Sequence, residues 1–580
     1  MKNSVIKKRI FLISWIIYCY LLFVSFKVLK EFFNDIWICL IFGVIIAWIG
    51  YEIKNNNLKR IGIKGNLYCS FFSILIAFCF TGNTLFYSSQ TGVFDTMYKK
   101  VLGFLGFSIF VFVVFRYIIQ LFVEHTQSNV VFEKRELEIK TLIIVGIWIF
   151  ISIIYLIAYN PANMFPDTYN QLQQINHIIE YSEHHPIMHT LMLKFLLNIC
   201  NTPIIVVLVQ IAVMAYVLFL WIKKFLKIGV KFKWLIIFSA LNIFNVPYGL
   251  LITNIWKDTL YNISLLGITY FLLEMFENRN IIKGKFFWIN YSVFMFMIYS
   301  FRHNGVIPFV LITIPFVFIL SKIQKNKIKT LIIVTAVIIM SGIVAKGTLI
   351  HNNDDAGTKY IPFINDIASI LVTDPEKLTA NTRDMMLNII PLEDWQHGYN
   401  SCDSDTYTYH TDNFFQNLNK LDMGTFVRAY TETLFHHPIR IISARLMGSQ
   451  LQWNVFKREG TNDYIYEVDN TPDIAAVFGY ERVNNGLKNF IDSTYNCFEK
   501  SVILNTILYR SGIYFVILLF VICVIIFKNI KLLYALFPVI GNSLSLFIAM
   551  TCQHLRYTWS INIISLFMLI YVWHSGKVKK

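Results

Sequence analysis

The sequence predicts an all-α polytopic membrane protein with about 14 transmembrane helices and a soluble domain on the outer face. The 580-residue chain is 56% hydrophobic and only 15% charged. This much apolar surface cannot be hidden inside water-soluble cores of ordinary size. The apolar runs are continuous, and many reach the ~20 residues that a helix needs to span hydrocarbon. These observations exclude a soluble enzyme, a disordered scaffold and a secreted disulfide framework.

Fourteen apolar runs are the predicted spans. They lie near residues 10–26, 36–51, 67–87, 101–123, 141–159, 203–222, 234–252, 259–276, 286–301, 305–321, 331–349, 503–527, 531–550 and 557–574. A shorter apolar stretch at 186–201 is better interpreted as an interfacial helix, because counting it as a span would put the next lysine-rich loop outside.

The distribution of charge predicts the orientation. Residues 351–500 hold 21 acidic and 12 basic residues, a net −9, so the remaining 39 basic and 14 acidic residues carry +25. If the N-terminus is inside, the cytoplasmic tails and short loops hold 29 Lys and Arg, against 10 on the outer side or in spans. By the positive-inside rule, this predicts a multi-pass plasma-membrane protein with both termini cytoplasmic and no nucleic-acid partner.

Four regions follow from this threading. Residues 1–130 form four additional N-terminal helices, and 131–350 a transmembrane core with a first outer loop at 160–202. Residues 351–502 form an extracytoplasmic, mostly helical domain, with an amphipathic helix near 424–456 on the membrane surface, and 503–580 supply three helices and a basic tail. Cys402 and Cys497 lie in the outer region, so an oxidising compartment would allow them to pair.

Polar residues gather at the predicted outer ends of the helices, in four segments distant in sequence. The loop after 141–159 contributes Asp167, His184 and His185; the next outer turns contribute Lys257 with Asp258, Arg302 with His303, and His554 with Arg556. Ionisable residues at this depth are costly unless they are paired or functional. Because anchoring cations prefer the inner face, three on the outer face indicate an anionic ligand.

Each residue also has a structural interpretation. Lys257, Arg302 or Arg556 alone would be read as a cation that reaches the lipid headgroups. Asp167 follows Pro166 and is a suitable N-cap residue for the next helix. His184 and His185 precede a proline as turn residues often do, and a divalent metal on Asp167 and these histidines is left open.

At this point the motifs resemble a known family. FPDTYNQ, EHHPIMHT, WKD, FRHNG and a late RY at the start of a span resemble the GT-C superfamily of polytopic glycosyltransferases. More narrowly, they resemble a bacterial GT-C-like membrane family described as a domain of unknown function. The resemblance covers roughly residues 141–575 and leaves out the first four helices. Position 165 is Phe, so the Asp-x-Asp or Glu-x-Asp pair common in GT-C enzymes is missing.

The resemblance implies a membrane glycosyltransferase that moves a sugar from a polyprenyl-phosphate carrier to a cell-envelope glycan or lipid acceptor at the outer face. Asp167 would be the inverting base, and Lys257, Arg302 and Arg556 would bind the donor phosphate. His184, His185, Asp258, His303 and His554 would orient the substrates or hold a metal.

Two other classes remain open. An envelope polysaccharide polymerase would also use lipid carriers and outer-face arginines. A lipid-linked sugar transporter or flippase is the non-enzyme alternative, but transporters usually place polar residues at the bilayer midplane and show repeated halves.

Overall fold

The computed structural model describes residues 62–86, 97–124, 132–350, 357–457, 479–480 and 485–575. In these ranges the regular secondary structure consists of helices. The helices of the bundle are α3 (Ile63–Phe86), α4 (Met97–Glu124), α5 (Lys134–Ala158), α6 (Pro166–Ile175), α7 (Ile187–Ile199), α8 (Ile204–Lys227), α9 (Phe232–Leu241), α10 (Val246–Thr253), α11 (Lys257–Glu277), α12 (Lys285–Ser300), α13 (Val306–Ile323), α14 (Ile328–Leu349), α24 (Gly486–Lys500), α25 (Val502–Leu504), α26 (Gly512–Lys528), α27 (Phe537–Ala549) and α28 (Leu555–His574). A separate group comprises α15 (Ile361–Leu371), α16 (Ala380–Leu387), α17 (Leu392–Gly398), α18 (Asp405–Thr408), α19 (Phe414–Asn419), α20 (Met423–His436) and α21 (Pro438–Gly448). The short helix α22 (Gln450–Trp453) follows this group and packs against α26 and α28 of the bundle.

Long apolar helices make the described chain compatible with a multi-pass membrane protein. Within the described ranges, nine helical segments are long and apolar enough to cross a membrane, and two bent pairs raise the number to 11. The pairs are α9 and its 3₁₀ extension with α10, bent by 74°, and residues Val502–Tyr509 with α26, bent by 55°. The expected span 286–301 appears as α12, which has 16 residues and is not among these nine segments. The expected spans 10–26 and 36–51 lie outside the described residues.

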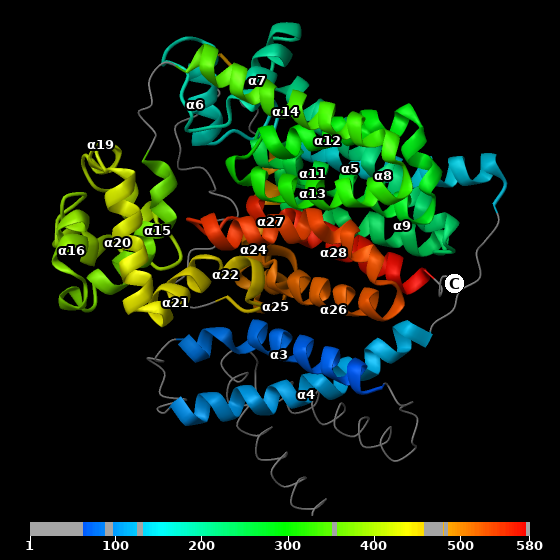
Figure 1. Ribbon diagram of the computed structural model, residues 1–580. Helices are drawn as coiled ribbons and strands as arrows, with labels where there is room; N and C mark the ends of the chain where they lie inside the picture. The colour runs from blue at the N-terminus through cyan, green and yellow to red at the C-terminus, as the bar shows by residue number, and fades with distance from the viewer. Residues whose placement is uncertain are drawn as a thin grey trace, which may run out of the picture.

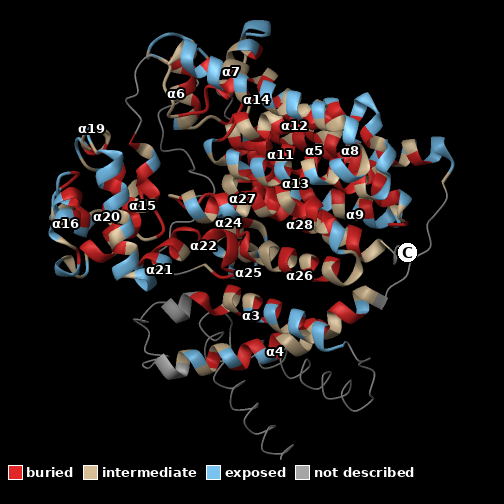
Figure 2. Ribbon diagram, in the orientation of Figure 1, coloured by how far each residue is buried: buried red, intermediate tan, exposed pale blue. Residues whose placement is uncertain are grey.

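The helices α11 and α28 form the centre of the bundle. Both are mostly buried, whereas α14 exposes much of its surface at the edge (Figure 2). Large aromatic side chains fill the space between the helices of the bundle. For example, the ring centroids of Trp221 on α8 and Phe567 on α28 lie 5.4 Å apart. Because apolar residues occur on all sides of α11, the sequence suits a helix that is enclosed by other helices.

The last two of the four predicted N-terminal helices lie along one side of the bundle. α3 and α4 run side by side next to α26 (Figure 1). Phe115 and Phe122 of α4 both pack edge-on against Phe520 of α26, with ring centroids 5.6 and 4.8 Å apart. These helices are therefore attached through aromatic packing, at a distance from the polar motifs.

The helices α15–α21 form a polar domain beside the bundle (Figure 1). It has its own hydrophobic core, in which Ile364, Ile367 and Trp395 are fully buried. The predicted domain boundary at residue 502 extends past this core. Helix α24, with the buried residues Ile491 and Tyr495, belongs to the core of the bundle instead.

One expectation for residues 351–502 needs correction. The stretch 424–456 is not one surface helix, because it breaks at His437 before Pro438 and again at Ser449. Arg445 does not face lipid: it is buried, and its Nη2 lies 2.7 Å from Oδ1 of Asp366. The sequence left open whether Cys402 and Cys497 pair, and in the structure both are free thiols.

The basic ends of the helices meet at the opposite end of the bundle from the polar motifs. Lys224, near the end of α8, pairs with Glu274 of α11 at 2.6 Å and with Glu277. Tyr571 of α28 donates a 2.6 Å hydrogen bond to Glu277. The C-terminal ends of α8, α11 and α28 are thus joined at one end, and the N-terminal ends of α11 and α28 point to the other.

Candidate functional site

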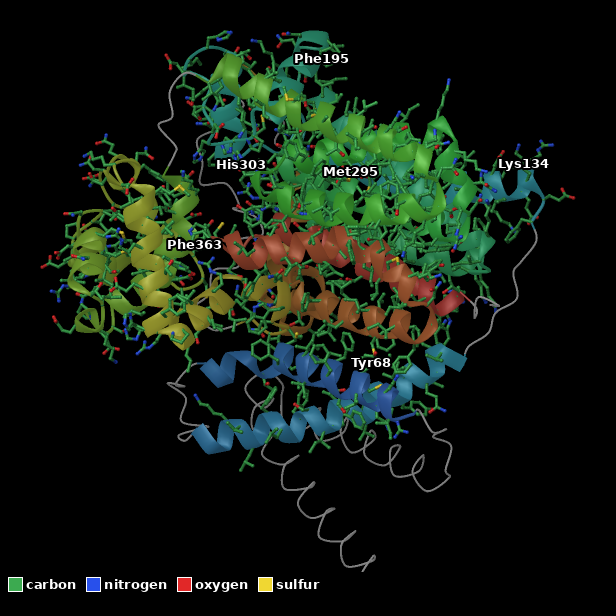
Figure 3. The ribbon with its side chains drawn as sticks, in the orientation of Figure 1. Tyr68, Lys134, Phe195, Met295, His303 and Phe363 are labelled. Atoms are coloured by element: carbon green, nitrogen blue, oxygen red, sulfur yellow. The ribbon has the colours of Figure 1, made fainter. Side chains whose placement is uncertain are left out.

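One polar cavity collects nearly all the residues that the sequence singled out. It has a volume of about 550 Å³ and lies where the bundle meets the polar domain. In Figure 3, His303 lies on the side of the bundle toward the polar domain, and Phe363 on the facing side of that domain. The predicted residues that line the cavity are Asp167, His184, His185, Lys257, Arg302, His303, His554 and Arg556. Asp258 does not line the cavity and is completely buried.

Asp167 is held by two cations from other helices. Its Oδ2 accepts hydrogen bonds from Nζ of Lys257 at 2.6 Å and from Nη1 of Arg556 at 2.9 Å. Burial by itself would raise the pKa of Asp167, but the charges of Arg556 and Lys257 outweigh that effect and lower the pKa well below its usual range. Asp167 is therefore ionised at neutral pH.

Asp167 is not the cap of its helix. The N-cap of α6 is Phe165, Pro166 is its first residue, and Asp167 lies in the first turn, so the capping interpretation is wrong. The carboxylate instead turns toward Lys257 and Arg556. Its position near the helix start still places a negative charge where the helix dipole favours one.

A second carboxylate, Asp258, supports the other arginine. Its Oδ1 lies 3.2 Å from Nε of Arg302, and its Oδ2 lies 3.8 Å from Nε of Arg556. The Arg302 guanidinium also sits over the ring of Tyr557 at 4.6 Å. Asp258 thus holds Arg302 and Arg556 in place from the buried side of the site.

Backbone pairing brings the loop after α5 to the start of α11. The amide of Asn163 donates to the carbonyl of Thr253 at 3.1 Å, and the amide of Ile255 donates to the carbonyl of Asn163 at the same distance. The Thr168 hydroxyl then donates to the carbonyl of Ile255 at 2.8 Å. These bonds hold α6 against the turn before α11, which explains why Asp167 and Lys257 touch.

Asn262 fixes the other side of the site. Its Nδ2 donates to the carbonyl of Arg556 at 2.7 Å, and its Oδ1 accepts from the amide of Ser560 at 2.9 Å. This side chain is buried, so both bonds are protected from water. Helix α28 is therefore held in register with α11, with Arg556 beside Lys257.

Two buried histidines that line the cavity, His185 and His554, are neutral. Burial, reinforced by Lys257, lowers the pKa of His185 well below its ordinary value, and burial with Arg556 does the same for the pKa of His554. Nδ1 of His185 lies 3.3 Å from Nζ of Lys257, so it accepts and Nε2 carries the proton. His184 packs next to His185, with ring centroids 4.6 Å apart, and His303 lies exposed at the cavity.

Unused hydrogen-bond donors remain on this wall. Nη1 of Arg302 and Nε1 of Trp256 are buried and have no hydrogen-bond partner among the described residues. Both side chains line the cavity. Buried donors are normally satisfied, so these two indicate a ligand. Among the residues that the structure describes, no group of three or more His, Cys, Asp and Glu has a geometry that could hold a metal ion.

The opposite wall was missed by the sequence interpretation. It comes from the polar domain and includes Ser404, Asp405, Thr408, Tyr409 and His410. The only local signal is the dense run of acidic, hydroxyl and aromatic residues in DSDTYTYH, at 403–410. Such a run is equally typical of a polar surface loop, so the fold was needed to place it at the cavity.

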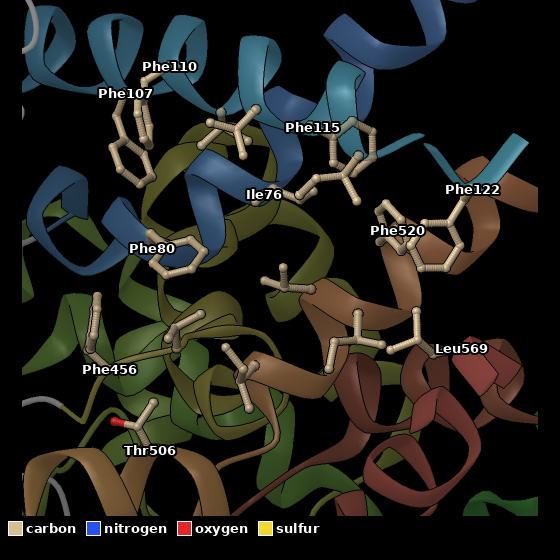
Figure 4. A pocket seen from close by; sticks show the side chains of 17 residues that line it. Ile76, Phe80, Phe107, Phe110, Phe115, Phe122, Phe456, Thr506, Phe520 and Leu569 are labelled. Carbon is tan, nitrogen blue, oxygen red and sulfur yellow. The ribbon is translucent and has the colours of Figure 1, made fainter. Parts of the chain in front are cut away.

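A second cavity of about 630 Å³ is lined mainly by apolar side chains of α3, α4 and α26 (Figure 4). It shares no lining residue with the polar cavity. It includes Phe80, Phe107 and Phe520 but none of the nine predicted site residues.

No family model matches this chain, and no curated protein and no solved structure shows significant similarity to it.

Proposed function

We propose that the protein is a membrane glycosyltransferase that moves a sugar from a polyprenyl-phosphate carrier to a cell-envelope acceptor at the outer face of the membrane. One observation carries the proposal: four segments distant in sequence bring Asp167, Lys257, Arg302 and Arg556 to one cavity at the ends of apolar helices. The proposed topology has 14 spans, both termini inside and residues 351–502 outside.

The side of the cavity formed by Lys257, Arg302 and Arg556, called the cation wall below, is suited to bind a phosphate. Three cations, Lys257, Arg302 and Arg556, face two carboxylates, Asp167 and Asp258, so one positive charge on this wall is uncompensated. The N-terminal ends of α11 and α28 add the positive ends of two helix dipoles. The unused donors of Arg302 and Trp256 provide further hydrogen bonds to phosphate oxygens.

In the proposed reaction, an acceptor hydroxyl oxygen attacks the anomeric carbon on the face opposite the phosphate. The bond from that carbon to the phosphate oxygen breaks, and its electron pair leaves with the polyprenyl phosphate. Lys257, Arg302 and Arg556 stabilise the charge that develops there. The hydroxyl proton passes to Asp167, and the configuration of the sugar is inverted.

Donor binding would itself prepare Asp167. Two cations hold the carboxylate in the absence of a ligand, and a base with such a low pKa accepts a proton poorly. A phosphate that shares Lys257 and Arg556 weakens their hold on Asp167 and moves its pKa toward the range of an effective base. The site is thus arranged so that the base becomes effective only when the donor is present.

The depth of the site favours a transferase over a transporter. Lys257 is the first residue of α11, Arg556 is the second residue of α28, and His303 is the first residue of the 3₁₀ turn that leads into α13. A transport site is expected near the bilayer midplane. Groups at helix ends serve chemistry at the membrane surface better than passage across it.

The test compares cells that carry the wild-type gene, no gene, or Asp167→Asn as the only copy. Lipid-linked sugars are profiled by mass spectrometry, and transfer is measured in membranes. The expected result is accumulation of one lipid-linked sugar without the gene and in Asp167→Asn, with transfer reduced by roughly 10²- to 10⁴-fold.

Glu180→Gln is the matched control, because Glu180 is an exposed carboxylate of the same loop that does not line the cavity. It should transfer sugar at the wild-type rate. Lipid-linked sugar pools that do not change when the gene is deleted would refute the proposed activity, and normal transfer by Asp167→Asn would remove Asp167 from the mechanism.

A further inference from the structure

The wall opposite the cations has the composition of a sugar-binding surface. Ser404, Asp405, Thr408, Tyr409 and His410 all come from the polar domain and line the same cavity. They supply hydroxyls, a carboxylate and an aromatic ring, the groups that pair with the hydroxyls and the apolar faces of sugars. The donor phosphate in the proposed function needs none of them.

Two hydroxyls on this wall are unused. Ser404 and Thr408 are 1% and 2% exposed, and Oγ of Ser404 and Oγ1 of Thr408 have no hydrogen-bond partner within the described ranges. A buried hydroxyl without a partner costs free energy, so it is uncommon in a site that works without a ligand. These atoms indicate a hydrogen-bonding ligand on this side of the cavity.

An aromatic surface lies next to them. The side chain of Tyr409 is 60% exposed, and its ring lies 5.4 Å from that of Phe415, which also lines the cavity. Exposed aromatic side chains usually interact with a partner of mixed polarity, apolar on one face and hydrogen-bonding at its edges. A pyranose ring has that character.

The charge of the wall limits the ligand further. Asp403 is completely buried, and its Oδ1 accepts a hydrogen bond from the amide of Asp405 at 3.0 Å. Burial and the charge of Asp403 raise the pKa of Asp405 to about 6. An anionic ligand would be repelled by these carboxylates, whereas an uncharged one can donate hydroxyls to Asp405.

The two walls are held at a fixed spacing. The amide of Ser404 donates to the carbonyl of Thr551 at 2.9 Å. Gln553, in the loop that leads to His554 and Arg556, accepts from the amide of Leu451 at 2.7 Å and donates to the carbonyl of Gly448 at 2.6 Å. A ligand on the polar-domain wall therefore faces a ligand on the cation wall across the same cavity.

We propose that the 404–410 wall is the acceptor subsite, and that the acceptor is an uncharged, hydroxyl-rich glycan rather than a phosphorylated or acidic polymer. The assignment of this glycan as the acceptor rests on the proposed function, whereas the binding of a neutral glycan does not. Asp405 accepts hydrogen bonds from hydroxyls of the glycan, and the hydroxyls of Ser404 and Thr408 exchange hydrogen bonds with it. The ring of Tyr409 packs against a sugar ring.

The test measures binding without any donor, so that it is independent of transfer. The full chain in lipid nanodiscs is titrated calorimetrically with cello-, malto- and chitohexaose, and with hexagalacturonate as the anionic counterpart. At least one neutral hexasaccharide should bind more tightly than hexagalacturonate. Its affinity should fall about tenfold or more in Asp405→Asn, which loses a charged hydrogen-bond acceptor, and similarly in Tyr409→Ala.

Two variants serve as controls. Tyr409→Phe keeps the ring and should bind like the wild type, which shows that the loss in Tyr409→Ala is not a folding defect. Asp412→Asn alters an exposed carboxylate of the same domain that does not line the cavity, and it should change nothing.

The outcomes separate this inference from the proposed function. No binding of any neutral hexasaccharide, tighter binding of hexagalacturonate, or wild-type affinity in both Asp405→Asn and Tyr409→Ala would overturn the acceptor subsite, even if sugar transfer occurs. Neutral-glycan binding that depends on Asp405 and Tyr409 would uphold it, even if no transfer activity is found.

Discussion

At the scale of single residues, the site is a set of charges that neutralise one another only in part. Asp167 is paired with Lys257 and Arg556, and Asp258 with Arg302 and more distantly with Arg556. Arg556 is thus the cation that both carboxylates share. Side chains that are this little exposed keep their electrostatic interactions strong, because water screens them poorly.

Replacing Arg556 with Gln should weaken donor binding more than the same change at Lys257 or Arg302. A desolvated charge that loses its partner costs roughly 2 kcal/mol or more, about 30-fold. The measurement is the donor KM in membranes that contain equal amounts of folded protein. Lys346→Gln is the control, since Lys346 is a half-exposed cation at the same end of the bundle that does not line the cavity. An unchanged donor KM in Arg556→Gln would mean that the arginine has only a structural role.

Acceptor affinity should depend on pH through Asp405. Its pKa is raised to about 6, so the carboxyl is protonated below that pH and becomes a charged acceptor of hydroxyl hydrogens above it. The KM for a neutral glycan should therefore fall as the pH rises from 5 to 7. The groups that face Asp405 electrostatically are Asp403, Arg556, Asp167 and Cys552.

The control for this pH dependence is Asp405→Asn. In this variant the KM for the neutral glycan should be higher than in the wild type and should not change with pH across the same range. Asp167, His185 and His554 have pKa values well below their usual range, so Asp167 stays ionised and the two histidines stay neutral between pH 5 and 7. The same slope in the variant as in the wild type would assign the titration to another group.

At the scale of elements, the site depends on where helices begin and end. The turn of η3 (His303–Gly305) connects α12 to α13 and carries Arg302 directly before it. A Cβ atom on Gly305 would lie 1.8 Å from the carbonyl oxygen of Ile298, so only glycine lets the chain return this closely. Glycine in FRHNG is thus needed to aim Arg302 at the cavity.

Gly305→Ala should therefore lower thermal stability and raise the donor KM together, because the backbone must move and carry Arg302 with it. Overpacking of this kind costs about 1–3 kcal/mol. Gly347→Ala is the matched control, since nothing lies within 4 Å of its added Cβ atom. Thermal unfolding in detergent and donor titration provide both readouts, and a Gly305→Ala protein as stable and active as the wild type would contradict the steric explanation.

At the scale of the whole molecule, two bodies form one cavity. The bundle supplies cations at its helix ends, the polar domain supplies hydroxyls and a carboxylate, and Gln553 bonds the two together. The paired ends of α8, α11 and α28 around Lys224 lie at the far end of the bundle. This separation agrees with a basic cytoplasmic end and a functional outer end.

A membrane-impermeant maleimide should label Cys200 and Cys497 on intact cells, because both are exposed and both belong to the proposed outer face. The double variant Cys200→Ser with Cys497→Ser should lose this labelling. Lys283→Cys, at an exposed position of the basic end, should react only after the cells are broken. Labelling of Lys283→Cys on intact cells would invert the orientation and with it the proposed donor and acceptor side.

The sequence by itself determined the helical, membrane-type architecture, because hydrocarbon requires long apolar helices and those runs are visible residue by residue. It also selected Asp167, Lys257, Arg302 and Arg556, since charges at the less basic ends of such helices are conspicuous. It did not determine that Asp167 binds two cations rather than capping α6, that 424–456 breaks into separate helices, or that Ser404, Asp405 and Tyr409 face the cations. Those features depend on contacts between residues far apart in the chain, such as Asn163 with Thr253, Asn262 with Ser560 and Leu451 with Gln553. Apolar periodicity carries no record of such pairings, so only the tertiary structure decided which charges meet and what they face.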